Sequence, residues 1–414
     1  MSSVEHFSRH KKRQTDRAIS LAYASLAADA RARGHFDELL CHVRTRAPRL
    51  FDAPWAEEQH LGIEALINLA RHWEEHIRPL ATWPGSDRSW RAVVNSLAQH
   101  RLSKHRIPAF LSAAWYATDE AFGEAKRRWF VAHGAGASLR SLGLPIQMTR
   151  KMEHVFLASP DHFGIEYAMR RAELLGLGAE PALVDAVLAA RPALDLHHGD
   201  FWRTAWLLLI SHRWEGDTGQ VAPLIDFLHA VRHERVAVDT ADGIVLREPP
   251  LPDLSLKGRT VRSVLRLMVD WHRNLGLGIG GLTWERSRLR PIVLEVPHED
   301  QSRPPTFWEL TELTNSAQLR AEGAALQHCV ASYSHACWQG RSRIWSIRRR
   351  CNVSVRSVLT VEVDPRRRVV VQARGFRNRR AAGRALNVLQ TWAARENLRL
   401  ATISPGRNGD RARN

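Results

Sequence analysis

The chain has little of several residue types and patterns that define protein classes. Its 414 residues include four cysteines, Cys41, Cys329, Cys337 and Cys351, which are too few for a disulfide scaffold. The longest continuous apolar run, from Ala205 to Ile210, is far shorter than the ~20 residues of a membrane-spanning helix. The first residues also lack the apolar segment of a secretory signal. We therefore expect a soluble, cytoplasmic protein that does not act at a membrane.

Lysine is scarce as well, with six residues against 54 arginines. The 60 basic residues exceed the 43 acidic residues, which gives a formal net charge of +17 and a pI of about 10.8. Such a charge favours a polyanionic partner. The preference for arginine over lysine can also follow from codon usage, so the number of arginines does not by itself indicate phosphate recognition.

Acidic residues are rarest near the end of the chain. Residues 341–414 contain 19 arginines, no lysine and four acidic residues, a formal net charge of +15. Three clusters stand out, namely Arg348, Arg349 and Arg350, then Arg366, Arg367 and Arg368, then Arg377, Arg379 and Arg380. Because arginines bind phosphates with little sequence preference, we expect these clusters to contact nucleic acid. The alternative is an ordinary solvated surface.

Residues 1–240 are typical of a helical region. Apolar residues from Leu61 to Trp73 recur every three or four positions, and a second helix is expected to start near Asp87 or Ser89. Further helices are expected at 107–116, 122–131, 165–175 and 181–190, and after Asp200 as an N-cap. No fixed repeat is apparent. Most of the 15 tryptophans fall on apolar stripes, which indicates core packing, and this region is a candidate for binding protein partners.

Residues 241–300 form a predicted connector. A hairpin is expected at 236–248 around Asp242 and Gly243, followed by three prolines. A basic amphipathic helix follows within 255–272. The glycines from Gly276 to Gly281 come after this helix rather than after a strand, so we interpret them as a linker and not as a dinucleotide or phosphate-binding loop. We expect no cofactor.

Residues 301–403 are predicted to form a small α+β domain with a polar tail at 404–414. We expect helices at 306–315 and 326–340, with Gly340 just after the second, a short strand at 343–348, and a last helix at 379–397. Strands at 357–363 and 369–374 form a hairpin. The whole chain is thus predicted to be α+β, with a large all-α N-terminal region and a small C-terminal domain built on a short antiparallel sheet.

The C-terminal motifs resemble the PcfJ-like family, which is named after a protein of a conjugative plasmid and also occurs in phage-like elements. They are Leu326-x-His328-Cys329-Val330-x-x-Tyr333, then Gly340, Ile344 and Arg348, then Leu359 to Val363, then Gln372-Ala-Arg-Gly-x-x-Asn378. The resemblance extends over about 255–395. It implies a role in a plasmid, phage or other mobile element and carries no established activity.

Four polar residues of the predicted hairpin form a candidate catalytic surface. Thr360 and Glu362 share one face of the first strand, and Gln372 and Arg374 share one face of the second. If Asp364 pairs with Arg368, Thr360 lies opposite Gln372 and all four lie on one side. We favour this register over pairing Asp364 with Val369, because only in the first do Leu359, Val361, Val371 and Ala373 form one coherent apolar face.

The His328–Cys329 pair invites a nucleophile hypothesis. On one helix, however, the two side chains diverge by ~100°, so a thiol packed as a small apolar group is the simpler interpretation. If the helix begins only after Cys329, both residues lie in a loop.

The histidines and cysteines do not form a pattern typical of a metal site. His328 and His335 are spaced poorly for binding one ion, and no Cys-x-x-Cys is present. The group of His197, His198 and Asp200 is explained by a helix cap. We therefore expect no metal site.

Two functions follow from these patterns. The first is a nucleic-acid-binding accessory protein of a mobile element that holds phosphates with its arginine clusters. The second is an enzyme acting on nucleic acid or a nucleotide through His328, Glu362, Gln372 and Arg374, with Arg348, Tyr333, Thr360 and Asn378 as further candidates. An enzyme requires His328 to reach the polar face of the hairpin in a concave pocket, whereas a binder requires only an arginine-rich surface. We favour the first.

Overall fold

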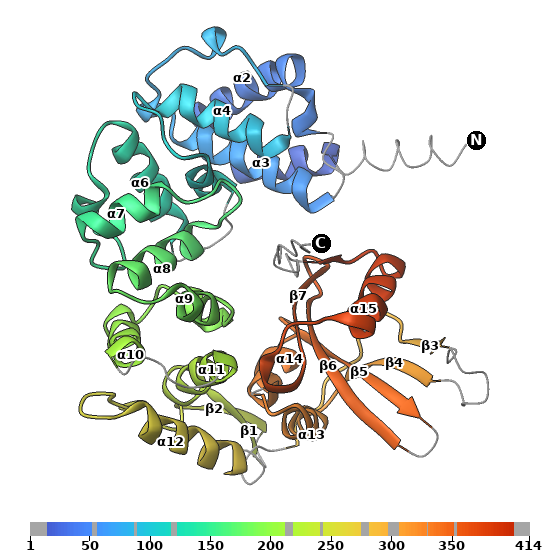
Figure 1. Ribbon diagram of the computed structural model, residues 1–414. Helices are drawn as coiled ribbons and strands as arrows, with labels where there is room; N and C mark the ends of the chain where they lie inside the picture. The colour runs from blue at the N-terminus through green and yellow to red at the C-terminus, as the bar shows by residue number, and fades with distance from the viewer. Residues whose placement is uncertain are drawn as a thin grey trace, which may run out of the picture. The chain divides into compact units, whose positions relative to one another are not determined.

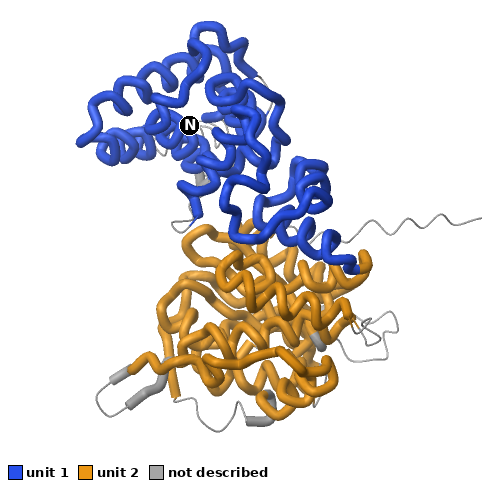
Figure 2. The backbone as a smooth tube through the Cα atoms, turned by 90° about the vertical axis from the view of Figure 1, so that its left-hand side faces the viewer, with its two compact units in different colours: residues 1–179 blue, residues 180–414 orange. Residues whose placement is uncertain are grey.

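The computed structural model describes residues 15–51, 56–86, 89–116, 122–211, 218–240, 243–274, 281–296, 306–328, 330–351 and 354–400. The chain divides into two compact units, residues 1–179 and 180–414 (Figure 2). Helices make up the first unit, and a six-stranded sheet lies in the second, so the predicted α+β class is confirmed. Within the described ranges, no helix combines the length and the apolar composition needed to cross a membrane.

Unit 1 consists of amphipathic helices joined by short 3-10 turns. The predicted helix around Leu61 is present as α3, with Ile63, Leu66 and Leu69 buried. The predicted helix start near Ser89 is also confirmed, because the Ser89 hydroxyl accepts a hydrogen bond from the Ala92 backbone N–H. The elements are α2 (Ala30–Arg46), η1 (Pro48–Leu50), α3 (Ala56–Arg71), η2 (Trp73–Glu75), η3 (Leu80–Thr82), α4 (Trp90–Leu102), η4 (Ala109–Ser112), α5 (Ala113–Tyr116), α6 (Gly123–Gly134), η5 (Leu139–Ser141), α7 (Arg150–Leu157) and α8 (Ile165–Gly176).

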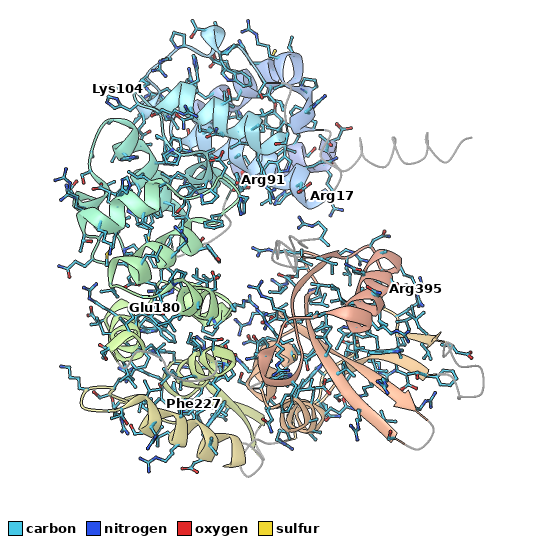
Figure 3. The ribbon with its side chains drawn as sticks, in the orientation of Figure 1. Arg17, Arg91, Lys104, Glu180, Phe227 and Arg395 are labelled. Carbon is cyan, nitrogen blue, oxygen red and sulfur yellow. The ribbon has the colours of Figure 1, made fainter. Side chains whose placement is uncertain are left out.

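Unit 2 begins with a helical part. Phe227 of α11, labelled in Figure 3, packs against Trp271 of α12 with ring centroids 5.4 Å apart. Asp200 lies inside the first turn of α10 and not at its N-cap, because that helix already begins at Gly199. The predicted hairpin at 236–248 is confirmed as β1 and β2. The elements are α9 (Pro181–Leu188), η6 (Arg191–Leu194), α10 (Gly199–Ser211), η7 (Thr218–Gln220), α11 (Val221–Arg232), β1 (Val236–Thr240), β2 (Gly243–Arg247) and α12 (Val261–Asn274).

The six-stranded sheet has the strand order β3-β4-β5-β6-β7-β8. All neighbouring strands are antiparallel except β7 and β8, which are parallel. The sheet includes residues before position 301, so it reaches into the predicted connector. The elements of this part are β3 (Ile292–Val296), β4 (Thr306–Leu313), α13 (Ser316–Leu326), η8 (Val330–Tyr333), α14 (Ser334–Trp338), β5 (Arg343–Cys351), β6 (Ser354–Asp364), β7 (Val369–Arg374), η9 (Phe376–Asn378), α15 (Gly383–Arg395) and β8 (Arg399–Leu400).

The helix predicted at 306–315 is wrong, because these residues form strand β4. Phe307, Leu310 and Leu313 recur every three positions, which imitates a helix face. In the strand, Trp308 and Leu310 instead point to the same side and are buried in the core of the sheet.

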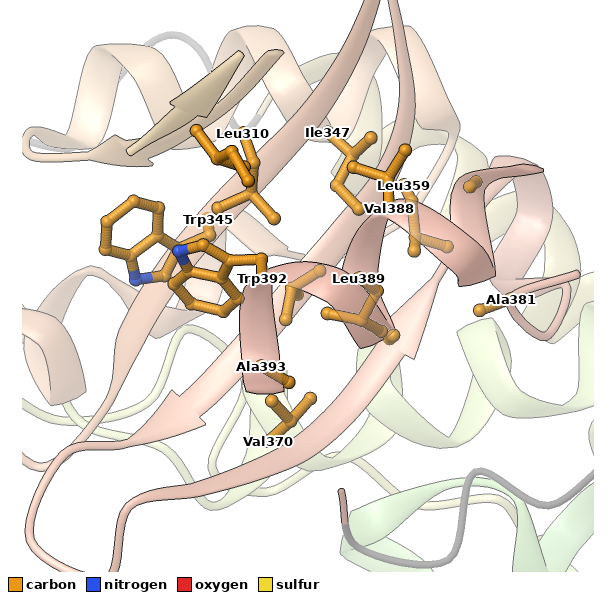
Figure 4. Packing of buried hydrophobic residues seen from close by; sticks show 14 of the residues in the cluster. Leu310, Trp345, Ile347, Leu359, Val370, Ala381, Val388, Leu389, Trp392 and Ala393 are labelled. Atoms are coloured by element: carbon orange, nitrogen blue, oxygen red, sulfur yellow. The ribbon is translucent and has the colours of Figure 1, made fainter. Parts of the chain in front are cut away.

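Helix α15 covers one face of the sheet and forms the main hydrophobic core of this part of unit 2 (Figures 1 and 4). Trp392 is fully buried, lies 4.8 Å from the ring of Trp345, and donates a hydrogen bond from Nε1 to the carbonyl oxygen of Arg290. Val388 and Leu389 fill the space beside Ile347 (Figure 4). The predicted apolar stripe of the last helix is thereby confirmed.

The opposite face of the sheet is covered by α13, η8 and α14. The single helix predicted at 326–340 is wrong, because α13 ends at Leu326 and Gln327 adopts the left-handed conformation with a φ of 52°. The expected glycine after this segment is confirmed, since Gly340 follows α14 with a φ of 69°. Cys337 is buried as a small apolar side chain, as predicted for the thiols of this stretch.

The compact units divide between Ala179 and Glu180, inside the segment 1–240 that was predicted as one helical region. The predicted boundary near residue 240 lies at the end of β1, where the chain has changed from helix to strand. The predicted linker at 276–280 and the tail at 404–414 lie outside the described residues.

We expect Trp392→Ala to lower the free energy of unfolding of unit 2 by about 3–5 kcal/mol, because it leaves a large cavity under α15. Trp392→Phe is the matched control, since it keeps one aromatic ring and loses the hydrogen bond to Arg290 and a smaller part of the packing, so its loss of stability should be smaller. Urea unfolding followed by circular dichroism measures both. Equal midpoints for wild type and Trp392→Ala would contradict the prediction.

Candidate active site

Strand β6 separates an apolar face from a polar face. Leu359, Val361 and Val363 point toward α15 and are buried in the core. Thr360 and Glu362 alternate with them and point to the face covered by α13 and η8, where both are also buried. The polar face of the hairpin is therefore enclosed by other elements instead of facing water.

The predicted hairpin register is wrong, yet the shared face it implied is present. Asp364 pairs with Val369, and Thr360 lies opposite Arg374, not opposite Gln372. A bulge leaves Val371 without a partner on β6, so that Glu362 faces Gln372 while Val363 faces Val370. The extra residue places Val370 in the core in the position expected for Val371, and it keeps Gln372 and Arg374 on the side of Glu362.

His328 lies in the turn that follows α13. For this residue, the alternative of a loop position is therefore the correct one. Its N–H donates to the carbonyl oxygen of Gly323, and a Cβ at Gly323 would lie 2.8 Å from the carbonyl oxygen of His328. Glycine is thus required for this close approach. The turn directs the imidazole to β6, where His328 Nε2 lies 2.9 Å from Thr360 Oγ1. Cys329 lies outside the described residues.

Glu322 of α13 joins this pair into a buried network that we did not predict. Its carboxylate accepts hydrogen bonds from the hydroxyls of Thr360 at 2.9 Å, Ser346 at 2.9 Å and Ser357 at 2.7 Å. Since the single hydroxyl proton of Thr360 is directed to Glu322, the hydrogen bond between Thr360 and His328 must be donated by Nε2 of the imidazole. The network thereby selects one tautomer and one orientation of His328.

Glu362 is the centre of a second network. One carboxylate oxygen accepts hydrogen bonds from Ser342 at 3.0 Å and from Arg191 of η6 at 2.5 Å. The other accepts from Gln372 Nε2 at 2.9 Å, and the second N–H of that amide donates to the Tyr333 hydroxyl at 2.8 Å. The side chain of Glu362 is 3% exposed, whereas that of Arg191 is 58% exposed, so Arg191 covers Glu362 from the solvent side.

The helical part of unit 2 supplies one wall of the site. Arg374 donates to the carbonyl oxygen of Ala189 at 2.7 Å, and Asn378 donates to Asp226 of α11 at 3.3 Å. The pocket between these residues measures about 30 Å³, which is room for water only. Its lining includes all the residues predicted as catalytic together with three further candidates: His328, Tyr333, Thr360, Glu362, Gln372, Arg374 and Asn378.

Electrostatics distinguish the groups around this pocket. Burial and the neighbouring Arg380 lower the pKa of Arg374. Burial has the largest single effect on Arg191 and acts to lower its pKa, but the charge and hydrogen bond of Glu362, together with Tyr333 and Asp364, raise that pKa overall. Burial, followed by the charge of Glu362, raises the pKa of the Cys337 thiol, so this cysteine is not a thiolate nucleophile.

The model of the PcfJ-like protein family matches residues 310–387. This segment is similar to the PcfJ-like family. The match confirms the family resemblance expected from the motifs around His328, Glu362 and Gln372. Comparisons with curated proteins and with solved structures give no match.

The PcfJ-like segment holds the two buried glutamates but not the whole site. Arg191 and Asp226 come from elements more than 80 residues before it. No local signal identified these two residues or Glu322, because each gains its role only through contacts with distant strands. Within the described ranges, no group of three or more His, Cys, Asp or Glu side chains is placed to hold a metal ion.

The arginine clusters lie apart from one another. Arg348–Arg350 and Arg366–Arg368 sit at opposite ends of β6, roughly 30 Å apart by the rise of a strand. Some of their members bind other parts of the protein. Arg350 pairs with Glu309 at 2.9 Å, and Arg368 donates to carbonyl oxygens at the end of α15. The side chain of Arg377 lies outside the described residues.

Most of the remaining arginines of the three clusters are exposed to solvent. Arg348 is half-buried beside Ser346, while Arg349, Arg366, Arg367, Arg379 and Arg380 are exposed. Arg349 also lies directly opposite the exposed Arg356 in the pairing of β5 with β6. Like charges in this arrangement repel, so the position favours an anion.

We expect Glu234, which lies near Asp226, to make the stability of unit 2 depend on pH. Burial raises its pKa to about 7, although Arg341 opposes the shift, and Asp226 adds to it. As pH rises from about 4.5 to 7, the unfolded chain loses this proton before the folded chain does, so stability falls. One pKa unit corresponds to ~1.4 kcal/mol, so the free energy of unfolding falls by at most about 3 kcal/mol over this range.

The variant Glu234→Gln removes this titration. Relative to wild type, it should gain stability between pH 4.5 and pH 7.5 in urea unfolding experiments. A difference between the two proteins that stays constant over this range would contradict the prediction.

Proposed function

We propose that unit 2 is an enzyme that acts on nucleic acid or a nucleotide. The observation that carries this proposal is the position of His328, which lines one concave pocket together with Glu362, Gln372 and Arg374. An accessory protein that only binds nucleic acid does not require a buried carboxylate and an oriented histidine in the lining of one pocket. Buried, oriented titratable groups of this kind are typical of catalytic sites.

The contacts suggest a role for each group in hydrolysis of a phosphodiester. Glu362 accepts the proton of an attacking water, and Gln372 holds its carboxylate in position. The new bond forms between water oxygen and phosphorus while the bond to the leaving oxygen breaks. The leaving oxygen takes a proton from Nδ1 of His328, because Nε2 of the same ring is held by its hydrogen bond to Thr360.

Arg191 and Arg374 are the cations available to the substrate phosphate. Arg374 is half-buried in the pocket wall, and Arg191 covers Glu362 from outside. Because the pocket holds only water while Arg191 is in place, the substrate must displace it from Glu362. A phosphate is a suitable competitor, since arginine binds phosphate and carboxylate oxygens with the same planar geometry. Arg191 then exchanges its ion pair with the Glu362 carboxylate for one with the substrate phosphate.

The exposed arginines support a polymeric substrate. The two ends of β6 are roughly 30 Å apart, and one duplex of about nine base pairs covers that length at ~3.4 Å per base pair. The resemblance to the PcfJ-like family adds the proposal that this substrate belongs to a plasmid, phage or other mobile element.

The test is incubation of the full chain with end-labelled single-stranded and double-stranded DNA and RNA, with product analysis. We expect wild type to yield cleaved product, and Glu362→Gln to lower the rate by about 10²–10⁴-fold. Glu295→Gln, on the exposed face of β3, is the matched control and should keep full activity. Intact substrates with wild type, or equal rates for Glu362→Gln and wild type, would refute the enzymatic proposal.

Binding without chemistry is the second candidate, and the opposed pair Arg349 and Arg356 favours it. Replacing both with glutamine should weaken nucleic-acid binding for all sequences alike and reduce the slope of log affinity against log salt by about 1 per lost phosphate contact.

Arg395→Gln is the matched control for this second candidate. Arg395, labelled on α15 in Figure 3, donates to Pro291 and pairs with Glu396. Fluorescence anisotropy at several salt concentrations measures the slope for each variant. An unchanged slope in the double variant would exclude this pair as a phosphate contact.

A further inference from the structure

Unit 1 contains a cavity that the proposed function does not use. It measures about 580 Å³, within the range of ~300–1,000 Å³ that is typical of small-molecule sites. It lies between the loop before η4 and the end of α7. Its lining combines apolar residues such as Ile107, Pro108 and Leu157 with the polar groups of Asn95, Arg106 and Asp161.

The walls of this cavity are held in place without a ligand. The N–H of Ile107 donates to Gln99 Oε1 at 3.2 Å, and Gln99 Nε2 donates back to the carbonyl oxygen of Ile107. Below them, Phe110 of η4 packs edge-to-face against Phe156 of α7, with centroids 5.1 Å apart. The loop and the helix end are therefore fixed relative to each other, and the cavity is preformed.

Three polar side chains in its lining have no partner among the described residues. The side-chain amide oxygen of Asn95, Oδ1, is buried without a hydrogen bond, which is unfavourable in a folded protein. Arg106 and Asp161 are exposed, and neither forms an ion pair or hydrogen bond within the described ranges. Opposite charges that line one cavity without pairing favour a ligand that has an anionic group for Arg106 and hydrogen-bond donors for Asp161.

We propose that this cavity binds a nucleoside monophosphate. Arg106 binds the phosphate, Asp161 accepts hydrogen bonds from the ribose hydroxyls, and the planar base lies against the apolar residues. Asn95 turns its amide to the edge of the base. An asparagine amide pairs in bidentate fashion with the amino group and ring nitrogen of adenine, so AMP is the preferred probe. This site is independent of the pocket around Glu362.

The test is titration calorimetry of the full chain with AMP, GMP, adenosine and a short oligo-dA. We expect saturable binding of AMP, weaker binding of GMP by about tenfold or more, and weaker binding of adenosine than of AMP. The oligo-dA arm separates a free nucleotide from a base presented by nucleic acid. Absence of saturable AMP binding, or equal affinity for AMP, GMP and adenosine, would overturn the proposal.

Variants separate binding from folding. Asn95→Leu removes a buried unpaired oxygen and keeps the branched shape of the side chain, with the added methyl volume facing the cavity, so its melting temperature should equal or exceed that of wild type while AMP affinity falls about tenfold or more. Arg106→Gln should remove the preference for AMP over adenosine. Gln99→Leu is the structural control and should lower the melting temperature. Wild-type AMP affinity in both Asn95→Leu and Arg106→Gln would overturn the assignment of this cavity.

Discussion

The burial of two carboxylates on one face of a β-sheet is the constraint on which the rest of unit 2 depends. A buried charge costs several kcal/mol unless its oxygens are satisfied, and both glutamates receive three hydrogen bonds. The donors differ in kind. Glu322 is held by three hydroxyls of neighbouring strands, whereas Glu362 depends in part on Arg191, an exposed side chain from η6. Glu362 is consequently the carboxylate whose environment a ligand can change.

The bulge at Val371 reconciles the hydrophobic core with this polar face. Without it, the pairing of Asp364 with Val369 would continue along β7 and place Val371 opposite Glu362. One additional residue restores the alternation, so that Val370 and Ala373 pack under α15 while Gln372 contacts Glu362. A one-residue irregularity thus allows one strand to serve both the stability of the domain and the geometry of the site.

The parts of the site that were predictable from sequence are those that local periodicity determines. Alternation along each strand correctly paired Thr360 with Glu362 and Gln372 with Arg374, but the two pairs share a face only because of the bulge at Val371, which the sequence did not predict. The strand β4 was missed because its apolar residues also satisfy a helical spacing, and only pairing with β3 and β5 decides between the two. Arg191 was beyond prediction, since 171 residues separate it from Glu362 and the folded chain alone brings them together.

These contacts bear on which part of the chain is the functional unit. The PcfJ-like segment 310–387 contains both buried glutamates but ends before Leu389 and Trp392, which fill the core beneath the sheet. It also lacks the part of unit 2 that covers Glu362. Arg191 of the helical part donates to Glu362 of the sheet, and Arg374 of the sheet donates to the carbonyl oxygen of Ala189 in the helical part. Since each part completes the hydrogen bonding of the other, the site is a property of unit 2 as a whole, and the segment that carries the family motifs is one component of it.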